Sequence, residues 1–439
     1  MEVISFIGLI LAVIVLMVGA YKGLGALPLT LIAALVVILT SGMPLWESFS
    51  QHYMTGYTSS YFNYFLLFTA SALYAEFMNV AGTASTIGHK FIDWFGREKV
   101  LLVTILIVAV LTYGGVSLFV VVFAVGPIMF LLFREADIPR HLTMACLIAG
   151  SSTFTMTAMP GSPQLANVVP TQYLGTTLTA APVVGIIASI MMFSMIMLYV
   201  TRELKVARKK GEHWSEPEGS SLSSKIIPRE ELPGTFQAFA PLISLTLIIV
   251  IGSQFIENST MLATIAMLVG ALLTYLLNFN KFASVKMTDV LTRGTGGGIT
   301  SIGGLAAVVA FGAVVRNSPA FADIVEWLLS LDINYYLQAV IATAAIAGIT
   351  GSSSGGLLIM YESLSQHFIA SGVNLGVLHR LTSIAAGSLD TLPHSPGLFV
   401  MFPALGLTHK DAYKHVFVIS VVIPGITVIT LLTYAILVG

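Results

Sequence analysis

The stretch GITGSSSGGLL, Gly348 to Leu358, interrupts an apolar run that continues on both sides of it. Backbone that leaves a helix within a membrane must be buried in protein or line a wet cavity, because unpaired amide groups in hydrocarbon cost several kcal/mol. Glycine permits the turn, and the hydroxyls add hydrogen-bond donors. The pattern predicts a re-entrant hairpin over about 335–370. Its tip is predicted to cradle a small anionic group with Ser352, Ser353, Ser354 and Gly355. The alternative is a helix-packing face of small residues.

The composition indicates that this stretch lies in a membrane protein. Hydrophobic residues make up 56% of the chain and charged residues 9%, which is typical of an integral membrane protein in a lipid bilayer. The net charge of -1 argues against a nucleic-acid partner, and the single cysteine, Cys146, cannot form an internal disulfide. The N-terminal residues lack a basic leader, so we expect a retained first span. These features predict an all-α, multi-pass protein of the inner (cytoplasmic) membrane.

Eight further apolar stretches are long enough to cross about 30 Å of hydrocarbon as helices. They lie at roughly 3–19, 24–42, 60–79, 180–201, 236–256, 260–279, 296–315 and 412–438. Two apolar regions between them, 99–170 and 335–406, are broken by Gly, Ser, Thr and Pro. The glycine-rich residues 294–304 match no nucleotide-binding motif, and we expect them to allow close helix packing.

The two broken regions repeat each other. RHLTMACLIAGSSTFTMTAMPGSP, from Arg140 to Pro163, parallels HRLTSIAAGSLDTLPHSP, from His379 to Pro396, and each follows a Gly/Ser interruption. The repetition predicts a duplicated chain. The first repeat would be 1–201, with a hairpin at about 99–133 and a broken helix at about 140–170. A cytoplasmic linker, 202–235, would precede the second repeat, 236–439, with its hairpin at about 335–370 and broken helix at about 379–406.

The distribution of basic residues predicts the orientation of the two repeats. About five crossings in each half, an odd number, would invert the second half relative to the first. With the linker inside, nearly all lysines and arginines near the membrane also fall inside, leaving only Arg316 and Arg380 outside. Seven crossings in each half would keep the same parity. The charge pattern therefore leaves open whether the hairpins are re-entrant or spanning.

The broken helices carry the other candidate site residues. GSSTFT in the first half supplies Ser151, Ser152, Thr153 and Thr155, and GSLDTLPHSPG in the second supplies Asp390, Thr391 and His394. The prolines of both segments remove amide donors and favour unwound backbone. An ionised carboxylate at this depth costs at least about 2.5 to 3.5 kcal/mol. We therefore expect Asp390 to carry a coupling proton, shared with His394. The alternatives are a helix cap for Asp390 and a structural hydrogen bond for His394.

No metal or cofactor motif and no nucleophile–base pair at reactive spacing is visible in the sequence, which disfavours an enzyme. A channel would not need inverted halves. A secondary transporter with alternating access fits the duplicated, broken helices best.

The chain resembles the gluconate permease (GntP) family of proton symporters, in the ion-transporter superfamily. The resemblance rests on SFIGLILAVIVLMVGAYKG, YFNYFLLFTASALYAEFMNVAGTASTIG, AFGAVVRNSPAFADI, TGSSSGG and GSLDTLPHSPG. It implies inverted repeats, two re-entrant hairpins, a homodimer built on scaffold helices, and elevator-type uptake of a small carboxylate such as gluconate or 3-hydroxybutyrate. Sodium is the alternative coupling ion within the superfamily. Because the predicted site contains no arginine at membrane depth, we expect the shorter, less hydroxylated acids.

Overall fold

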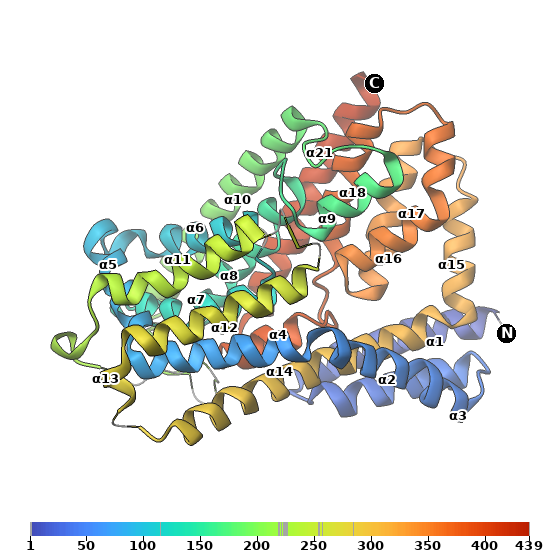
Figure 1. Cartoon of the computed structure of the whole chain (residues 1–439). Helices are drawn as coiled ribbons and strands as arrows, with labels where there is room; N and C mark the ends of the chain where they lie inside the picture. The colour runs from blue at the N-terminus through green and yellow to red at the C-terminus, as the bar shows by residue number, and fades with distance from the viewer. Residues whose placement is uncertain are drawn as a thin grey trace.

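The structure is a computed structural model, and it describes residues 2–114, 116–217, 220, 222, 227–252, 255–256, 258–283 and 285–438. All regular structure within these residues is helical (Figure 1). The helices of the first half are α1 (Glu2–Tyr21), α2 (Ala26–Thr40), α3 (Leu45–Glu47), α4 (Met54–Ala81), α5 (Thr83–Phe95), α6 (Val100–Tyr113), α7 (Leu118–Glu135), α8 (His141–Ser151), α9 (Leu165–Leu174) and α10 (Pro182–Lys209). Short π-helical or 3-10 turns lie at Ser48–Tyr53, Arg97–Lys99 and Phe154–Ala158.

The second half repeats this order. Its helices are α11 (Thr235–Gly252), α12 (Ser259–Leu277), α13 (Phe279–Phe282), α14 (Met287–Arg316), α15 (Pro319–Leu329), α16 (Tyr335–Thr350), α17 (Ser353–Ala370), α18 (Leu375–Leu389), α19 (Leu398–Ala404), α20 (His409–Val416) and α21 (Ile423–Val438), with short turns at Arg229–Glu231 and Phe417–Val422. Each half has a helical hairpin, α6–α7 or α16–α17, followed by a helix that breaks before a short second segment. Seven helices of the described residues are long and apolar enough to cross a membrane.

The predicted spans correspond to observed helices, but two of these are much longer than expected. The helix predicted at 60–79 is continuous from Leu45 to Ala81, and the one predicted at 296–315 begins at Met287. Polar and glycine residues at these ends dilute the apolar pattern, although the backbone stays helical through them. The structure thus extends both helices beyond their apolar centres.

The two long helices α4 and α14 pack against each other at very close range. A Cβ atom on Gly294 would lie 2.9 Å from the Cα of Leu73, and one on Gly298 would lie 2.6 Å from the Cα of Thr69. The predicted packing role of the glycine-rich stretch is confirmed. Because higher numbers on one helix pair with lower numbers on the other, the two helices are antiparallel, as Figure 1 shows.

The helices form two layers in this view. Helices α1, α2, α4, α12 and α14 run through the lower layer, while the hairpin α16–α17, the broken helix beginning with α18, and α10 and α21 lie above them (Figure 1). The two layers touch: a Cβ on Gly304 of α14 would lie 3.1 Å from the carbonyl oxygen of Phe399 in α19, and the rings of Phe68 in α4 and Phe123 in α7 lie 6.2 Å apart.

The linker between the halves is less exposed than its composition suggests. Leu222 is fully buried and contacts the Gly126 position of α7, while the buried Ser220 hydroxyl donates to the carbonyl of Ala404. Arg134 donates two hydrogen bonds to Glu216, at 2.8 and 2.6 Å, and thereby holds the pKa of that carboxyl group below its usual value. Linker residues 218–219, 221 and 223–226 lie outside the described residues, as does Gly115 of the first interruption.

Candidate functional site

The sequence GITGSSSGGLL forms the turn of the second hairpin. Helix α16 ends at Thr350, Gly351 adopts φ +63°, and the Ser352 hydroxyl caps α17 by accepting from the Gly355 amide at 3.2 Å. A Cβ on Gly356 would lie 2.6 Å from the Cα of Ala347, so only glycine lets the two arms approach this closely. Ser352, Ser353, Ser354 and Gly355 are all half-buried at or just after the turn.

The tip of this hairpin contacts the break in the second half. His394 donates through Nε2 to the carbonyl of Ile349 at 3.3 Å, and the Ser395 hydroxyl donates to the carbonyl of Gly351 at 3.2 Å. The Ser353 side chain lies within hydrogen-bonding reach of the Asp390 carboxyl group. The structure therefore brings together the hairpin tip, Asp390 and His394.

Asp390 follows the last residue of α18, and its side chain is 7% exposed. Its Oδ1 atom and the Nδ1 atom of His394 are buried without a hydrogen-bond partner in the described part of the chain. A buried polar atom left unpaired is costly, and such atoms mark places where a proton, water or ligand completes the contacts.

Thr391 contacts the elements behind the break. Its hydroxyl bonds with that of Ser420 at 2.5 Å, and its carbonyl accepts from Tyr413 at 3.2 Å. His409 donates through Nε2 to the carbonyl of Pro393 at 2.9 Å. These contacts hold the unwound backbone against α20 and the π-helical turn at Phe417–Val422.

The first-half hydroxyls are mostly occupied by their own helix. Ser151 donates to the carbonyl of Leu147, Thr153 to that of Ala149, and Thr155 to that of Gly150, each at 2.6 Å. A hydroxyl has one hydrogen to donate, so these three groups cannot also donate to an anion in this geometry. The Ser152 hydroxyl instead contacts the Ser151 hydroxyl, at 3.4 Å, rather than a backbone carbonyl of its own helix.

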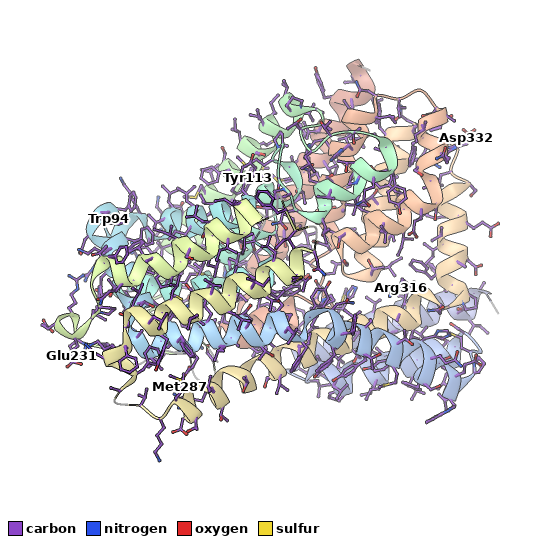
Figure 2. All side chains as sticks on the ribbon, viewed as in Figure 1. Trp94, Tyr113, Glu231, Met287, Arg316 and Asp332 are labelled. Atoms are coloured by element: carbon purple, nitrogen blue, oxygen red, sulfur yellow. The ribbon has the colours of Figure 1, made fainter. Side chains whose placement is uncertain are left out.

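Gln164 and Tyr113, for which the sequence predicted no role, hold the tip of the first hairpin. Gln164 donates to the carbonyls of Thr112 and Val116, at 2.7 and 3.2 Å, and Tyr113 donates to the carbonyl of Pro160 at 3.0 Å. The Tyr113 side chain is exposed, and Figure 2 shows it beside the green helices. The hydroxyls of Ser117 and Ser162 are buried there without a partner among the described residues. The signal available in the sequence was that Ser117 ends the Gly/Ser interruption TYGGVS and that Ser162 lies in the sequence Pro-Gly-Ser-Pro, 160–163.

The two breaks and both hairpins meet around the second break. A Cβ on Gly387 would lie 2.6 Å from Cγ2 of Thr157, so the first-half break touches the end of α18. A Cβ on Gly397 would lie 3.6 Å from Leu118, the first residue of α7. The Asp390 segment therefore has the first break and one arm of each hairpin as neighbours.

Arg380 is buried within the protein rather than exposed at its surface. It is 0% exposed, and its guanidinium donates to Asn167 Oδ1 at 2.9 Å and to backbone carbonyls of the first half. The acceptors lie 200 residues or more away in sequence, so local pattern gave no signal for the contact. Arg316, at the end of α14, is exposed (Figure 2).

A model of the GntP family of permeases matches residues 1–437 of the chain. The chain belongs to this family. It is 30% identical to an uncharacterized transporter, YxjC, of Bacillus subtilis (strain 168), over 94% of this chain and 95% of the relative. The crystal structure of the YdaH transporter of Alcanivorax borkumensis is similar to this chain with a TM-score of 0.43 and 12% sequence identity, over 88% of this chain and 86% of the other. The chain is thus a multi-pass membrane transporter, and not an enzyme.

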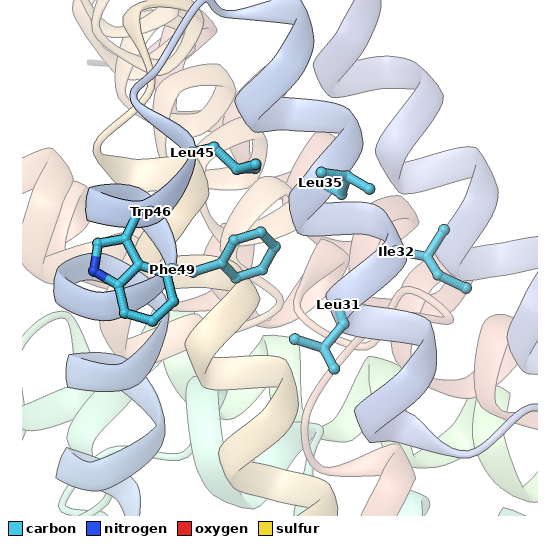
Figure 3. Close-up of a pocket in the computed structure, with 6 residues that line it drawn as sticks. All are labelled: Leu31, Ile32, Leu35, Leu45, Trp46 and Phe49. Carbon is cyan, nitrogen blue, oxygen red and sulfur yellow. The ribbon is translucent and has the colours of Figure 1, made fainter.

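A surface hollow of this GntP permease, of about 420 Å³, is formed by the apolar side chains of Leu31, Ile32, Leu35, Leu45, Trp46 and Phe49 on α2, α3 and the following π-helical turn (Figure 3). It carries no polar side chain suited to an anion. Within the described residues, no group of three or more His, Cys, Asp or Glu side chains is placed to hold a metal ion.

Proposed function

We propose that this permease imports a small organic hydroxycarboxylate, such as gluconate, 3-hydroxybutyrate or a related acid, by proton symport across the inner membrane. The observation that carries the proposal is the unpaired, buried Asp390 carboxyl group beside the tip of the second hairpin. Among described side chains that are buried, Asp390 is the one acid.

The surroundings of Asp390 suit a group that binds and releases a proton. Burial penalises the ionised form, and so does the position at the C-terminal end of α18, where the helix dipole is negative. The unpaired Nδ1 of His394, four residues on, is a nearby proton acceptor. Protonation of Asp390 would thus remove the cost of burying a charge when the carrier moves.

The substrate's carboxylate would bind at the hairpin tip through neutral donors. Ser352 accepts from a backbone amide, so its own hydrogen stays available, and Ser353 lies next to Asp390. From the first half we retain Ser151, Ser152, Thr153 and Thr155 as the proposed lining, with Ser152 the best placed to donate.

Alternating access would follow from two inverted repeats. The antiparallel packing of α4 and α14 supports the inversion, and the layer of hairpins and broken helices that packs on this pair supports an elevator-type movement along α4 and α14. Large apolar side chains on the scaffold, including Phe62 at 91% exposure, are compatible with a homodimer in the bilayer.

The orientation places the linker in the cytoplasm. A cysteine at the exposed Lys209 tests it, because Cys146 is fully buried and gives little background. An impermeant thiol reagent should label Lys209→Cys only after the cells are opened. Labelling in intact cells would reverse the proposed orientation.

Counterflow in proteoliposomes tests the function. Vesicles loaded with unlabelled 3-hydroxybutyrate or gluconate should accumulate the labelled acid transiently, since exchange through an alternating site requires a carrier. An acid-outside pH gradient should drive net uptake without sodium. Uptake that follows a sodium gradient and ignores pH would favour the sodium-coupled alternative, and the absence of exchange with any carboxylate would overturn the proposal.

A further inference from the structure

Arg380 links the second half of the chain to the break in the first half. Its NH1 group donates to Asn167 Oδ1 at 2.9 Å and to the carbonyl of Thr157 at 3.3 Å. Its NH2 group donates to the carbonyls of Ala180 at 3.0 Å and Leu178 at 3.4 Å. Arg380 comes from α18, whereas every one of these acceptors belongs to the first half.

The partner Asn167 is itself fixed in one orientation. Its Nδ2 group donates to the carbonyls of Ser162 at 2.7 Å and Leu178 at 2.9 Å, so Oδ1 is left as the acceptor. Nε2 of His379 lies 2.9 Å from that oxygen and must therefore carry a hydrogen. The Thr176 hydroxyl, 2.8 Å from Nδ1 of His379, can supply the matching donor to a neutral ring.

The network therefore contains a positive charge with only neutral acceptors. Within the described residues, Arg380 and Asp390 are the buried side chains that are ordinarily ionised, apart from histidines. They lie ten residues apart on α18 and its cap, or about 15 Å of helix rise. Nε of Arg380 is also buried without a partner. Burying a cation among neutral groups is costly unless an anion compensates it.

We propose that Arg380 is the fixed positive charge that restricts this permease to monocarboxylates and favours their binding when Asp390 is protonated. The inference rests on the proposed function. With Asp390 protonated, Arg380 leaves the core at +1, and one carboxylate neutralises it. A dicarboxylate would leave an uncompensated negative charge. With Asp390 ionised, the core is already neutral, and the carboxylate loses this favourable interaction.

Arg380 acts on the substrate through space and through the backbone it holds. Its contact with the Thr157 carbonyl lies in the short turn that touches Gly387, three residues before Asp390. Arg380 is thus a positioning residue for the first break as well as a charge. For charges about 15 Å apart at an effective dielectric constant near 20, its removal should weaken carboxylate binding by roughly five- to tenfold.

The test is equilibrium binding to the purified full-length protein, with 3-hydroxybutyrate as the monocarboxylate and malate as the dicarboxylate, from pH 5 to 8. The parent should prefer 3-hydroxybutyrate and bind it more tightly at low pH. Arg380→Gln should lose roughly five- to tenfold in affinity and most of the preference for the monocarboxylate. Arg380→Lys, which keeps the charge, should retain the preference. Arg316→Gln, at an exposed arginine, is the matched control and should bind like the parent.

A second variant keeps the proposal testable if Arg380→Gln does not fold. Asn167→Asp retains the acceptor oxygen for Arg380 and His379 but places a negative charge beside the guanidinium, so it should reproduce the loss of affinity. A folded Arg380→Gln or Asn167→Asp protein that binds 3-hydroxybutyrate with the parent's affinity and pH profile would overturn the inference. If the parent itself binds no carboxylate, the proposed function fails instead, so the two failures are distinguishable.

Discussion

Replacing Asp390 with asparagine tests the proposed coupling proton. The described residues contain a single buried acid, so the proposed cycle moves one proton with one monovalent anion and no net charge. A pH difference of one unit then supplies about 1.4 kcal/mol, or tenfold accumulation of the acid. Asparagine has nearly the same shape but cannot release a proton. Asp390→Asn should therefore reduce the accumulation ratio from about ten to one, while preserving exchange.

The assay uses proteoliposomes with a one-unit pH gradient and the membrane potential clamped to zero by potassium and valinomycin. Retained counterflow shows that the variant folds and binds substrate. Glu362→Gln, at an exposed acid on the same hairpin, is the control and should accumulate like the parent. Tenfold accumulation by Asp390→Asn would refute the assignment of the coupling proton.

Three further predictions follow from the packing and hydrogen bonds. Gly298→Ala should lower the free energy of unfolding by about 1 to 3 kcal/mol, because its Cβ would meet Thr69 backbone atoms at 2.6 and 2.9 Å; Gly296→Ala, where nothing lies within 4 Å, should be neutral or stabilising in the same thermal assay. Ser353→Ala should weaken carboxylate binding by a few-fold to a hundredfold, about 0.5 to 3 kcal/mol. Ser352→Ala should chiefly lower the free energy of unfolding, by about 0.5 to 2 kcal/mol, because the helix cap is lost. Equal affinity of Ser353→Ala and the parent would leave that serine as a packing residue. Glu216→Gln should loosen the linker by about 0 to 1 kcal/mol at pH 7, seen as faster limited proteolysis, with Glu230→Gln as the exposed control. Because Arg134 lowers the pKa of Glu216 in the docked linker, this stabilisation is present above the ordinary glutamate pKa and is lost as pH falls through the lowered value. The difference in cleavage rate between the parent and the variant should therefore shrink as the pH is lowered below the ordinary glutamate pKa.

The breaks were predictable because glycine and proline specify them locally. Gly351 at φ +63° ends α16 where the sequence placed the turn, and Leu389 ends α18 just before the predicted Asp390 segment. The ends of α4 and α14 were not predictable from hydropathy. Polar residues and glycines continue these helices where the glycines pack closely against the neighbouring helix. Local composition thus predicts where a membrane helix stops better than how far it extends.

The hydrogen-bond partners of the site residues could not be derived from sequence. Thr153 and Thr155 have the composition of donors to a ligand, but both donate to carbonyls one turn back. Arg380 follows a histidine at the start of an apolar helix, where a position at the interface is the usual expectation. Its acceptors are fixed only when the first-half loop around Leu178 and Ala180 folds over α18.

The two breaks share a sequence pattern and differ in charge. Thr153 and Asp390 each stand three residues after the glycine of an Ala-Gly-Ser sequence, Gly150 and Gly387. The threonine satisfies itself within its helix, whereas the aspartate is left with an unpaired oxygen. Arg380 crosses from the half that carries the acid to the half that lacks one. The described core thus holds one buried acid and one buried guanidinium, which is the charge set that the proposed carrier of one proton and one anion requires.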